Sequence, residues 1–476
     1  MPQEKPQTSF EPLQAMDRQF LAMEDENAHM HVTGFTLYEL EPLRSEAGGV
    51  DFPAFRQAIV AALDRIPIYR KKLAYTPIER HPVWVDDSEF NLDFHLRRVS
   101  LPPPGSRDQL AELASWLVGQ PLDHARPLWE MWLIEGIEDG KHFAVLSKMH
   151  HCMIDGGSGM NLMQLLLRTR PDRKIPASRP FEPRAAPSRA ELAAYELGRR
   201  LRSPLRVLGG LRGFAARPSP LGALWERLGA LGELLQNVLP ASKTPISGVP
   251  IGPHRRVDWL EMPFDELTKL RRELGCTLND LMLTIVTGAV QRYLGRRGVS
   301  LSGLDFRISI PVNVRRASDD RDSGNRVSTW IIPLPLDEPD PRAQLEAIQR
   351  RTRALKKSNQ ALGFELVMAA AEEMPALLSL WSWGVSGQVS MIVSNVPGPP
   401  IPLYMLGCRA VSMHPLPPLV PGVGLAVALL SYNGTLCWGF QADYDLVPDL
   451  SRFSDDVVDA HHALEALRAP ADANAS

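Results

Sequence analysis

The order of hydrophobic and polar positions predicts two α/β segments along the chain. Apolar residues alternate with polar ones over 31–40 and 142–150, which indicates strands, and they recur at helical spacing over 53–66 and 107–118. Similar patterns return after residue 254, where we expect strands over 257–263 and 306–314 and helices over 265–274 and 278–294. The predicted fold class is therefore α/β, in two globular halves.

The composition changes between these two segments. From residue 168 to residue 253 prolines and arginines crowd together and the periodic stretches become short, which is typical of a long connection. A chain of 476 residues is also long enough for two packed domains. We therefore divide it into an N-terminal domain at 1–170, a basic, proline-rich linker at 171–253 and a C-terminal domain at 254–476.

One long stretch with very few charges has to be tested as a membrane span. Between Glu373 and Asp443 the only Asp, Glu, Lys or Arg is Arg409. A spanning helix needs about 20 consecutive apolar residues, and glycine, asparagine, glutamine and proline interrupt this stretch. Buried strands joined by proline-rich loops explain it better. Because the first 20 residues also lack the pattern of a signal peptide, we expect a cytoplasmic protein.

Charge and cysteine content exclude other classes of protein. The 52 basic residues stand against 55 acidic ones, and a net charge of -3 argues against nucleic acid as the main partner. The four cysteines are far apart and form no closely spaced pair of the kind that builds zinc or redox sites. We expect reduced, mostly buried thiols.

The segment AVLSKMHHCMIDGGSGMNLMQLLL carries the strongest chemical signal. It is typical of a strand ending in His150 and His151, a turn with Asp155 and Gly156, and a helix. Successive side chains of an extended strand point to opposite faces, so one histidine is expected to act and the other to pack. That geometry disfavours a metal site, whose ligands must converge. A partly neutral imidazole can instead take a proton from a hydroxyl group.

Structural interpretations of these residues stay open at this point. His150 and His151 can also be two core histidines that pack beside a glycine turn. A second pair, His461 and His462, is not followed by an Asp-Gly turn, and we interpret it as packing or surface residues. Asn279 is a candidate donor to an oxyanion at the start of an apolar helix. Its neighbour Asp280 has capping-box spacing from Thr277, so it can serve only as a helix cap.

HHCMIDG resembles the HHxxxDG motif of bacterial wax ester synthase/diacylglycerol acyltransferases, which belong to the coenzyme A-dependent acyltransferase superfamily. Further segments resemble the blocks of that family in its order, over nearly the whole chain: MDRQFLAMEDENAHMHVTG, PLDHARPLWEMWLIEG, PIGPHRRV, TLNDLMLTIVTGAVQRYL, PVNVRR, SGNRVS, SNVPGPPIPLY and ADYDLVPD. The resemblance implies a two-domain, chloramphenicol acetyltransferase-like fold with the active centre between the domains. It also implies that His151 is the general base, that His150, Asp155 and Gly156 support it, and that Asn279 and Asp280 belong to a substrate-binding motif.

The implied reaction moves a long-chain acyl group from acyl-coenzyme A to a diacylglycerol or a long-chain alcohol. Acyl-coenzyme A is then a substrate, and we expect no cofactor and no metal. We also expect peripheral contact with the inner face of the membrane or with lipid inclusions, which arginines of the linker can provide. Two other hypotheses stay open, a non-catalytic lipid-droplet binding protein of the same fold and a metal-dependent hydrolase.

Two smaller features give structural expectations. Leu128 and Trp129 are expected to pack behind the histidine strand. Asn433 and Gly434 suit a tight hairpin turn, in a place where the family is expected to carry aspartate and glycine.

Overall fold

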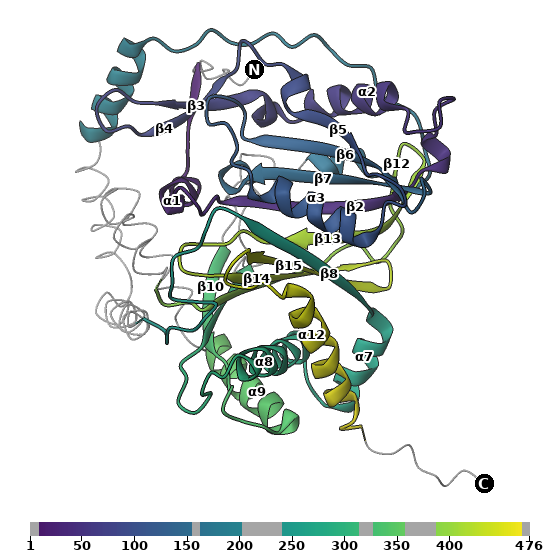
Figure 1. Ribbon diagram of the computed structural model, residues 1–476. Coiled ribbons are helices and arrows are strands. Elements are labelled where there is room, and N and C mark those ends of the chain that lie inside the picture. The colour runs from purple at the N-terminus through teal and green to yellow at the C-terminus, as the bar shows by residue number, and fades with distance from the viewer. Residues whose placement is uncertain (1–8, 155–161, 202–239, 314–326, 358–386, 469–476) are drawn as a thin grey trace, which may run out of the picture.

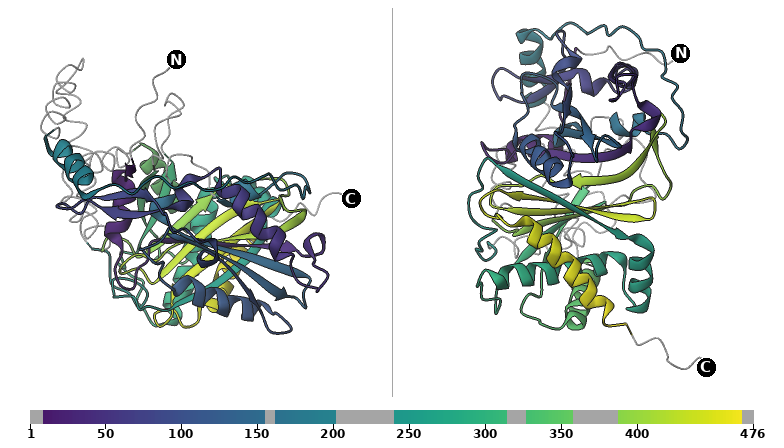
Figure 2. Two further views of the ribbon diagram at one scale, coloured as in Figure 1. Left: turned by 90° about the horizontal axis from the view of Figure 1, so that it is seen from above. Right: turned by 45° about the vertical axis from the view of Figure 1, so that its right-hand side comes forward.

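Figure 1 shows the protein, in a computed structural model, as two halves that each contain a six-stranded sheet. The structure describes residues 9–154, 162–201, 240–313, 327–357 and 387–468. The first sheet has the strand order β12-β13-β2-β7-β6-β5 and the second the order β10-β9-β11-β14-β15-β8. A small third sheet, β1-β4-β3, belongs to the first half. The right-hand view of Figure 2, like Figure 1, shows helices of the second half on the side of its sheet that faces away from the first half.

The strands of the first sheet are β2 (His31–Glu39), β5 (Leu96–Ser100), β6 (Trp129–Ile137), β7 (His142–His150), β12 (Tyr404–Met405) and β13 (Cys408–Leu416). Those of the second are β8 (Arg255–Pro263), β9 (Arg307–Asn313), β10 (Val327–Pro333), β11 (Met391–Val396), β14 (Leu425–Tyr432) and β15 (Thr435–Asp443). The third sheet contains β1 (Phe10–Pro12), β3 (Lys71–Tyr75) and β4 (Pro82–Asp86). The helices include α1 (Ala15–Met23), α2 (Phe52–Leu63), α3 (Arg107–Gly119), α4 (Leu162–Leu166), α7 (Phe264–Glu273), α8 (Leu278–Arg296), α9 (Pro341–Lys357) and α12 (Leu450–Glu465).

The strands and helices predicted from periodicity are confirmed to within a few residues at β2, β7, β8 and β9 and at α2, α3, α7 and α8. Local chemistry explains where two of the helices begin. Ser106 and Gln109 form a capping box at the start of α3, and Thr277 and Asp280 form one at the start of α8. Each box satisfies backbone N–H groups that the first helical turn leaves without an intrahelical partner.

One strand pairing joins distant parts of the chain. β13, although it comes late in the sequence, lies antiparallel to β2 in the first sheet, with His414 opposite Phe35. Figure 1 shows this strand between β2 and the second sheet. The polypeptide therefore returns from the second half to complete the sheet that carries the histidine motif.

Each half has its own hydrophobic core, and a third cluster lies at the seam. Tyr38 and Phe143 stack in the first core at a ring distance of 5.2 Å. Trp438 and Phe453 are fully buried in the second. The seam cluster combines residues of α3 with Trp259 of β8 and residues of the first sheet. Apolar burial thus holds the two halves together as well as stabilising each one.

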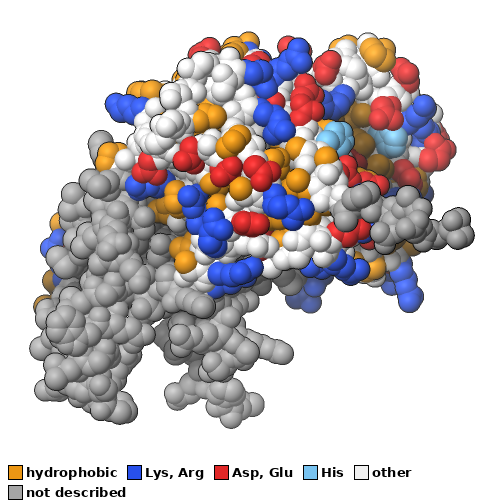
Figure 3. Space-filling model, turned by 90° about the horizontal axis from the view of Figure 1, so that it is seen from below, with side chains coloured by type: hydrophobic (Ala, Val, Ile, Leu, Met, Phe, Trp, Pro, Cys, Tyr) orange, Lys and Arg blue, Asp and Glu red, His pale blue; other side chains and the backbone are white. Residues whose placement is uncertain are grey.

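The structure also tests the predictions for the hairpin turn, the cysteines and a membrane span. Asn433 and Gly434 both have positive φ, at 44° and 85°, and join β14 to β15 as the expected tight hairpin. All four cysteines are free, and three of them are buried. Within the described residues, no helix is both long and apolar enough to cross a membrane. Basic and acidic side chains are interspersed on the face drawn in Figure 3.

Candidate active site

The histidine motif lies at the point where β7 ends. His150 is the last residue of the strand, opposite His31 of β2. His151 begins a short 3-10 turn, His151–Met153, rather than continuing the strand. The two rings are therefore separated by the end of the strand and the start of the turn, not by strand alternation alone.

His150 is fully buried, and its contacts define its tautomer. Its Nδ1 accepts a hydrogen bond of 3.1 Å from the backbone N–H of Cys152, so in the neutral ring the proton belongs on Nε2. Nε2 lies 3.1 Å from Oε1 of Glu24. One ring nitrogen of His150 is thus hydrogen-bonded, and the other lies close to a carboxylate without an aligned hydrogen bond to it.

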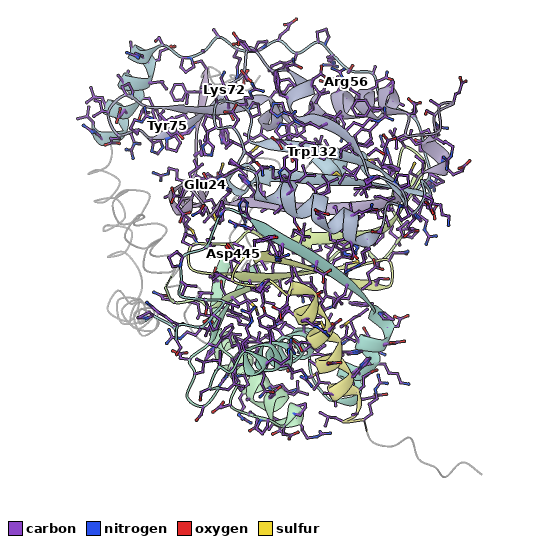
Figure 4. The ribbon with its side chains drawn as sticks, viewed as in Figure 1. Glu24, Arg56, Lys72, Tyr75, Trp132 and Asp445 are labelled. Carbon is purple, nitrogen blue, oxygen red and sulfur yellow. The ribbon has the colours of Figure 1, made fainter. Side chains whose placement is uncertain are left out.

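Glu24 links two histidines from different parts of the first half. It follows the last residue of α1, and its second carboxylate oxygen, Oε2, lies 3.2 Å from Nε2 of His124. The backbone N–H of Met30 donates to Oε1 at 3.3 Å. In Figure 4 the labelled Glu24 lies beside α1, close to the level at which the two halves meet.

These contacts shift the pKa values of Glu24 and His124. Burial by itself would raise the pKa of Glu24, but the bonds to His124 and His150 outweigh it and hold that pKa far below the usual value. The contact between Glu24 and His124 raises the pKa of His124. A negatively charged Glu24 therefore lies between two imidazoles at neutral pH.

His151 has different surroundings. It is partly exposed, its backbone N–H donates to the oxygen of Met30 at 2.8 Å, and its ring stacks on Phe20 of α1 with centroids 3.6 Å apart. No hydrogen-bond partner for its buried Nδ1 is present among the described residues. Although part of the residue is exposed, most of its ring is enclosed by protein, and this burial lowers the pKa of His151 to about 4, with the nearby His150 adding to the shift. The ring is accordingly neutral at cellular pH.

The remaining predicted site residues lie elsewhere or outside the described chain. Asp155 and Gly156 fall in the range 155–161, which the structure does not describe. Asn279 and Asp280 begin α8 in the second half. The Asp280 carboxylate accepts hydrogen bonds from Thr277 and, at 2.7 Å, from the hydroxyl of Thr352 on α9. Its contacts thus hold the start of α8 against α9, while Asn279 stays a prediction.

Potential metal ligands converge at another place. Among the described residues, the group whose ligand atoms lie within 4.8 Å of one another is His461, His462 and Glu465 on α12. His461 of this pair is buried and His462 is exposed. The histidines at the end of β7 form no such group within the described part of the chain.

Sequence reasoning missed Glu24, His124 and Phe20 as members of the site. Each lies in a segment that resembles a family block, MDRQFLAMEDENAHMHVTG or PLDHARPLWEMWLIEG, and that was the available signal. The expected packing of Leu128 and Trp129 is confirmed. Both are buried, and the oxygen of Leu128 accepts a hydrogen bond from the backbone N–H of His150.

Comparison with known families decides where the chain belongs. The model of the wax ester synthase/diacylglycerol acyltransferase catalytic domain matches residues 13–282, and that of the C-terminal domain of the same family matches residues 323–465. The chain belongs to this family. Members of the wax ester synthase/diacylglycerol acyltransferase family transfer acyl groups, and this chain is an acyl-coenzyme A-dependent O-acyltransferase.

Individual relatives agree with the family. A Mycobacterium tuberculosis protein named as a diacylglycerol O-acyltransferase is 32% identical over 470 residues, which is 94% of this chain and 88% of the relative. Another protein of that organism with the same activity in its name is 29% identical over 461 residues, 96% of each chain.

Solved structures confirm the expected two-domain fold. The wax ester synthase/diacylglycerol acyltransferase of Marinobacter aquaeolei VT8 superposes with a TM-score of 0.66 at 23% identity, covering 96% of this chain and 99% of the other. The first condensation domain of the calcium-dependent antibiotic synthetase gives a TM-score of 0.61 at 17% identity, with coverage of 97% and 98%. At these identities the likeness concerns the fold.

Proposed function

We propose that this acyltransferase moves a long-chain acyl group from acyl-coenzyme A to the hydroxyl of a diacylglycerol or a long-chain alcohol, with His151 as general base. The products are triacylglycerols or wax esters. The family supports the reaction class, and the names of the Mycobacterium relatives support diacylglycerol as acceptor.

The difference between the two motif histidines is the observation that carries the assignment of the base. His150 has no exposed surface, its Nδ1 accepts from the N–H of Cys152, and its Nε2 faces the Glu24 carboxylate at 3.1 Å. His151 is partly exposed and neutral at cellular pH. A base must reach its proton and be unprotonated. His151 meets both conditions, whereas His150 has no exposed surface from which to reach a substrate.

The reaction involves two proton transfers, one to His151 and one from it. The imidazole of His151 takes the proton from the acceptor hydroxyl, whose oxygen attacks the thioester carbonyl carbon. The tetrahedral oxyanion then collapses, the carbon–sulfur bond breaks, and the imidazolium returns its proton to the leaving thiolate, which departs as coenzyme A. No acyl-enzyme is required in this scheme, because the acceptor attacks the thioester directly.

Neighbouring residues hold this base in place. Phe20 lies flat against the His151 ring. The hydrogen bond from the N–H of Cys152 to His150 joins the residues before and after His151, and Glu24 lies 3.1 Å from His150. Fixing the base before the substrate arrives reduces the entropy that must be lost in the transition state. We assign Glu24 and His150 positioning roles. Asp155, Gly156 and Asn279 keep their predicted roles as supporting and substrate-binding residues.

The acceptor preference is tested by product analysis. Purified enzyme is given palmitoyl-coenzyme A with dipalmitoylglycerol, hexadecanol or no acceptor, with and without a chelator, and free coenzyme A and lipid products are measured. We expect release that depends on an acceptor, survives chelation, and yields triacylglycerol or wax ester. Lipid binding without coenzyme A release would favour the binding protein, and loss of turnover on chelation would favour the metal hydrolase.

A further inference from the structure

Four large apolar side chains are exposed on two neighbouring elements of the first half. Tyr75 at the end of β3 and Ile78 in the turn before β4 are 36% and 66% exposed. Leu197 and Leu201, on the helix described from residue 189 to 201, are 58% and 67% exposed. We call these four residues the hairpin–helix patch. Figures 1 and 2 both show this helix beside the hairpin formed by β3 and β4.

The two elements that carry the patch are firmly connected. Glu196 is fully buried and accepts hydrogen bonds from the backbone N–H groups of Ile78, at 3.1 Å, and Glu79. The Glu79 carboxylate in turn pairs with Arg199 and, at 2.7 Å, with Arg200. The exposed side chains therefore belong to an ordered surface.

The opposite side of the helix is anchored in the protein. Leu192 is buried against Phe10, Val83 and Val85, and Tyr195 packs edge-on against Phe10 at 5.2 Å. Because these residues and Glu196 face the small sheet, Leu197 and Leu201 are left at the surface. The exposure of large apolar residues on an anchored element is a feature of interaction surfaces.

The patch adjoins the active site through α1. Arg18 of α1 contacts His81 of the hairpin at 3.4 Å, and Phe20, two residues later, stacks on His151. Figure 4 shows the labelled Tyr75 and Glu24 on the same side of the molecule. A partner bound at the patch would therefore lie on the same side of the molecule as Glu24.

Charge indicates the chemistry of that partner. Glu79 and Glu196 are engaged in the contacts between the elements, and the exposed Glu191 near the start of the helix accepts a hydrogen bond from the backbone N–H of Ser188. The guanidinium of Arg80 lies over the ring of Tyr75 at 4.8 Å, and the Arg200 side chain is 47% exposed. Bulky aliphatic groups with tyrosine and arginine beside them suit the boundary between acyl chains and anionic headgroups.

We propose that the hairpin–helix patch docks the enzyme on an anionic lipid surface and so delivers lipid acceptors to the side of the molecule where His151 lies. The delivery of substrate rests on the proposed function. The docking itself rests only on the exposed residues. Ile78, Leu197 and Leu201 enter the acyl region, while Arg80 contacts headgroup phosphates.

The test uses the full-length protein and vesicles in a flotation assay. Vesicles contain phosphatidylcholine alone or with phosphatidylglycerol, and binding is compared for wild type, Ile78→Ser/Leu197→Ser and Arg80→Gln. A matched control, Ile401→Ser/Val411→Ser, removes side chains that are 46% and 42% exposed away from the patch. Coenzyme A release is measured in parallel with a short, water-soluble alcohol as acceptor, which requires no lipid surface.

We expect the patch double variant to bind vesicles about tenfold more weakly or worse, because interfacial affinity scales with buried apolar area. The control should bind like wild type, and Arg80→Gln should lose affinity only for vesicles with phosphatidylglycerol. Release with the soluble alcohol should be unchanged in every variant. Binding of the patch double variant equal to wild type, or no binding by wild type, would overturn the proposal. Patch-dependent binding without release from any acceptor would instead overturn the proposed function alone.

Discussion

Replacing Glu24 by glutamine removes the charge at the centre of the histidine cluster while keeping the size of the side chain. Glu24 is close to both His150 and His124, at 3.1 and 3.2 Å, and its side chain is 13% exposed. Glutamine can still accept from the N–H of Met30. The substitution therefore tests the two contacts with the histidines more than the local packing.

The expected loss of stability is about 2 kcal/mol at pH 6, because hydrogen bonds to charged groups contribute roughly 1.5–3 kcal/mol. Turnover should fall only slightly, because His150 and the turn that begins with His151 lose an anchor while the base itself remains. The assay is urea denaturation followed by tryptophan fluorescence, together with kcat measured on the same preparations. Glu41→Gln, at a side chain that is 82% exposed, serves as the control and should change stability by less than about 0.5 kcal/mol.

The sign of the pH dependence follows from the two pKa shifts. The pKa of Glu24 is lowered on folding, so its contribution is present above the unfolded value of 4.5 and is lost as the pH falls through the folded value. The pKa of His124 is raised, so its contribution is present below 6.5 and is lost as the pH rises through the folded value. The advantage of wild type over Glu24→Gln should thus be largest at about pH 5 to 6. An equal difference from pH 5 to pH 9 would refute the reasoning.

Three further predictions follow from single contacts. Because burial lowers the pKa of His151 to about 4, kcat/KM should lose activity in acid well below 6.5, and a pH profile with its acid limb at about 6.5 would contradict this. Thr352→Val should cost about 1–3 kcal/mol in urea denaturation, since Asp280 loses the donor at 2.7 Å. Gly439→Ala would place a Cβ 1.7 Å from a backbone oxygen of β13, so the midpoint of thermal unfolding should fall sharply. The control Gly295→Ala has open space around the new Cβ and should not lower that midpoint.

Local patterns predicted much of the fold, because they depend on neighbours in the sequence. The alternation over β7 and the capping box at Thr277 are each readable within about ten residues. The pairing of β13 with β2 is different, since it joins residues that lie far apart in the sequence, such as His414 and Phe35. Nothing in either strand states its partner, so this part of the topology could not be predicted from periodicity.

The candidate site shows the same division. The sequence singled out His150 and His151, and strand alternation predicted that they would differ in role. The structure separates them by a change from strand to 3-10 turn at His151, which the pattern did not indicate. Glu24 was missed because its carboxylate meets His124 and His150 only after α1 and β7 have packed. The identity of a buried charge partner is a tertiary property.

The central claim is that His151, not His150, is the base, and single-turnover kinetics test it most directly. Enzyme in excess over radiolabelled palmitoyl-coenzyme A is mixed with acceptor, and ester formation is followed for wild type, His151→Ala, His151→Gln and Glu24→Gln, after circular dichroism has shown that each is folded. We predict that both His151 variants lose at least about a hundredfold in rate, in the range that general-base catalysis supplies, while Glu24→Gln retains most of its ester formation. Ester formation by the folded His151 variants at the wild-type rate would contradict the account.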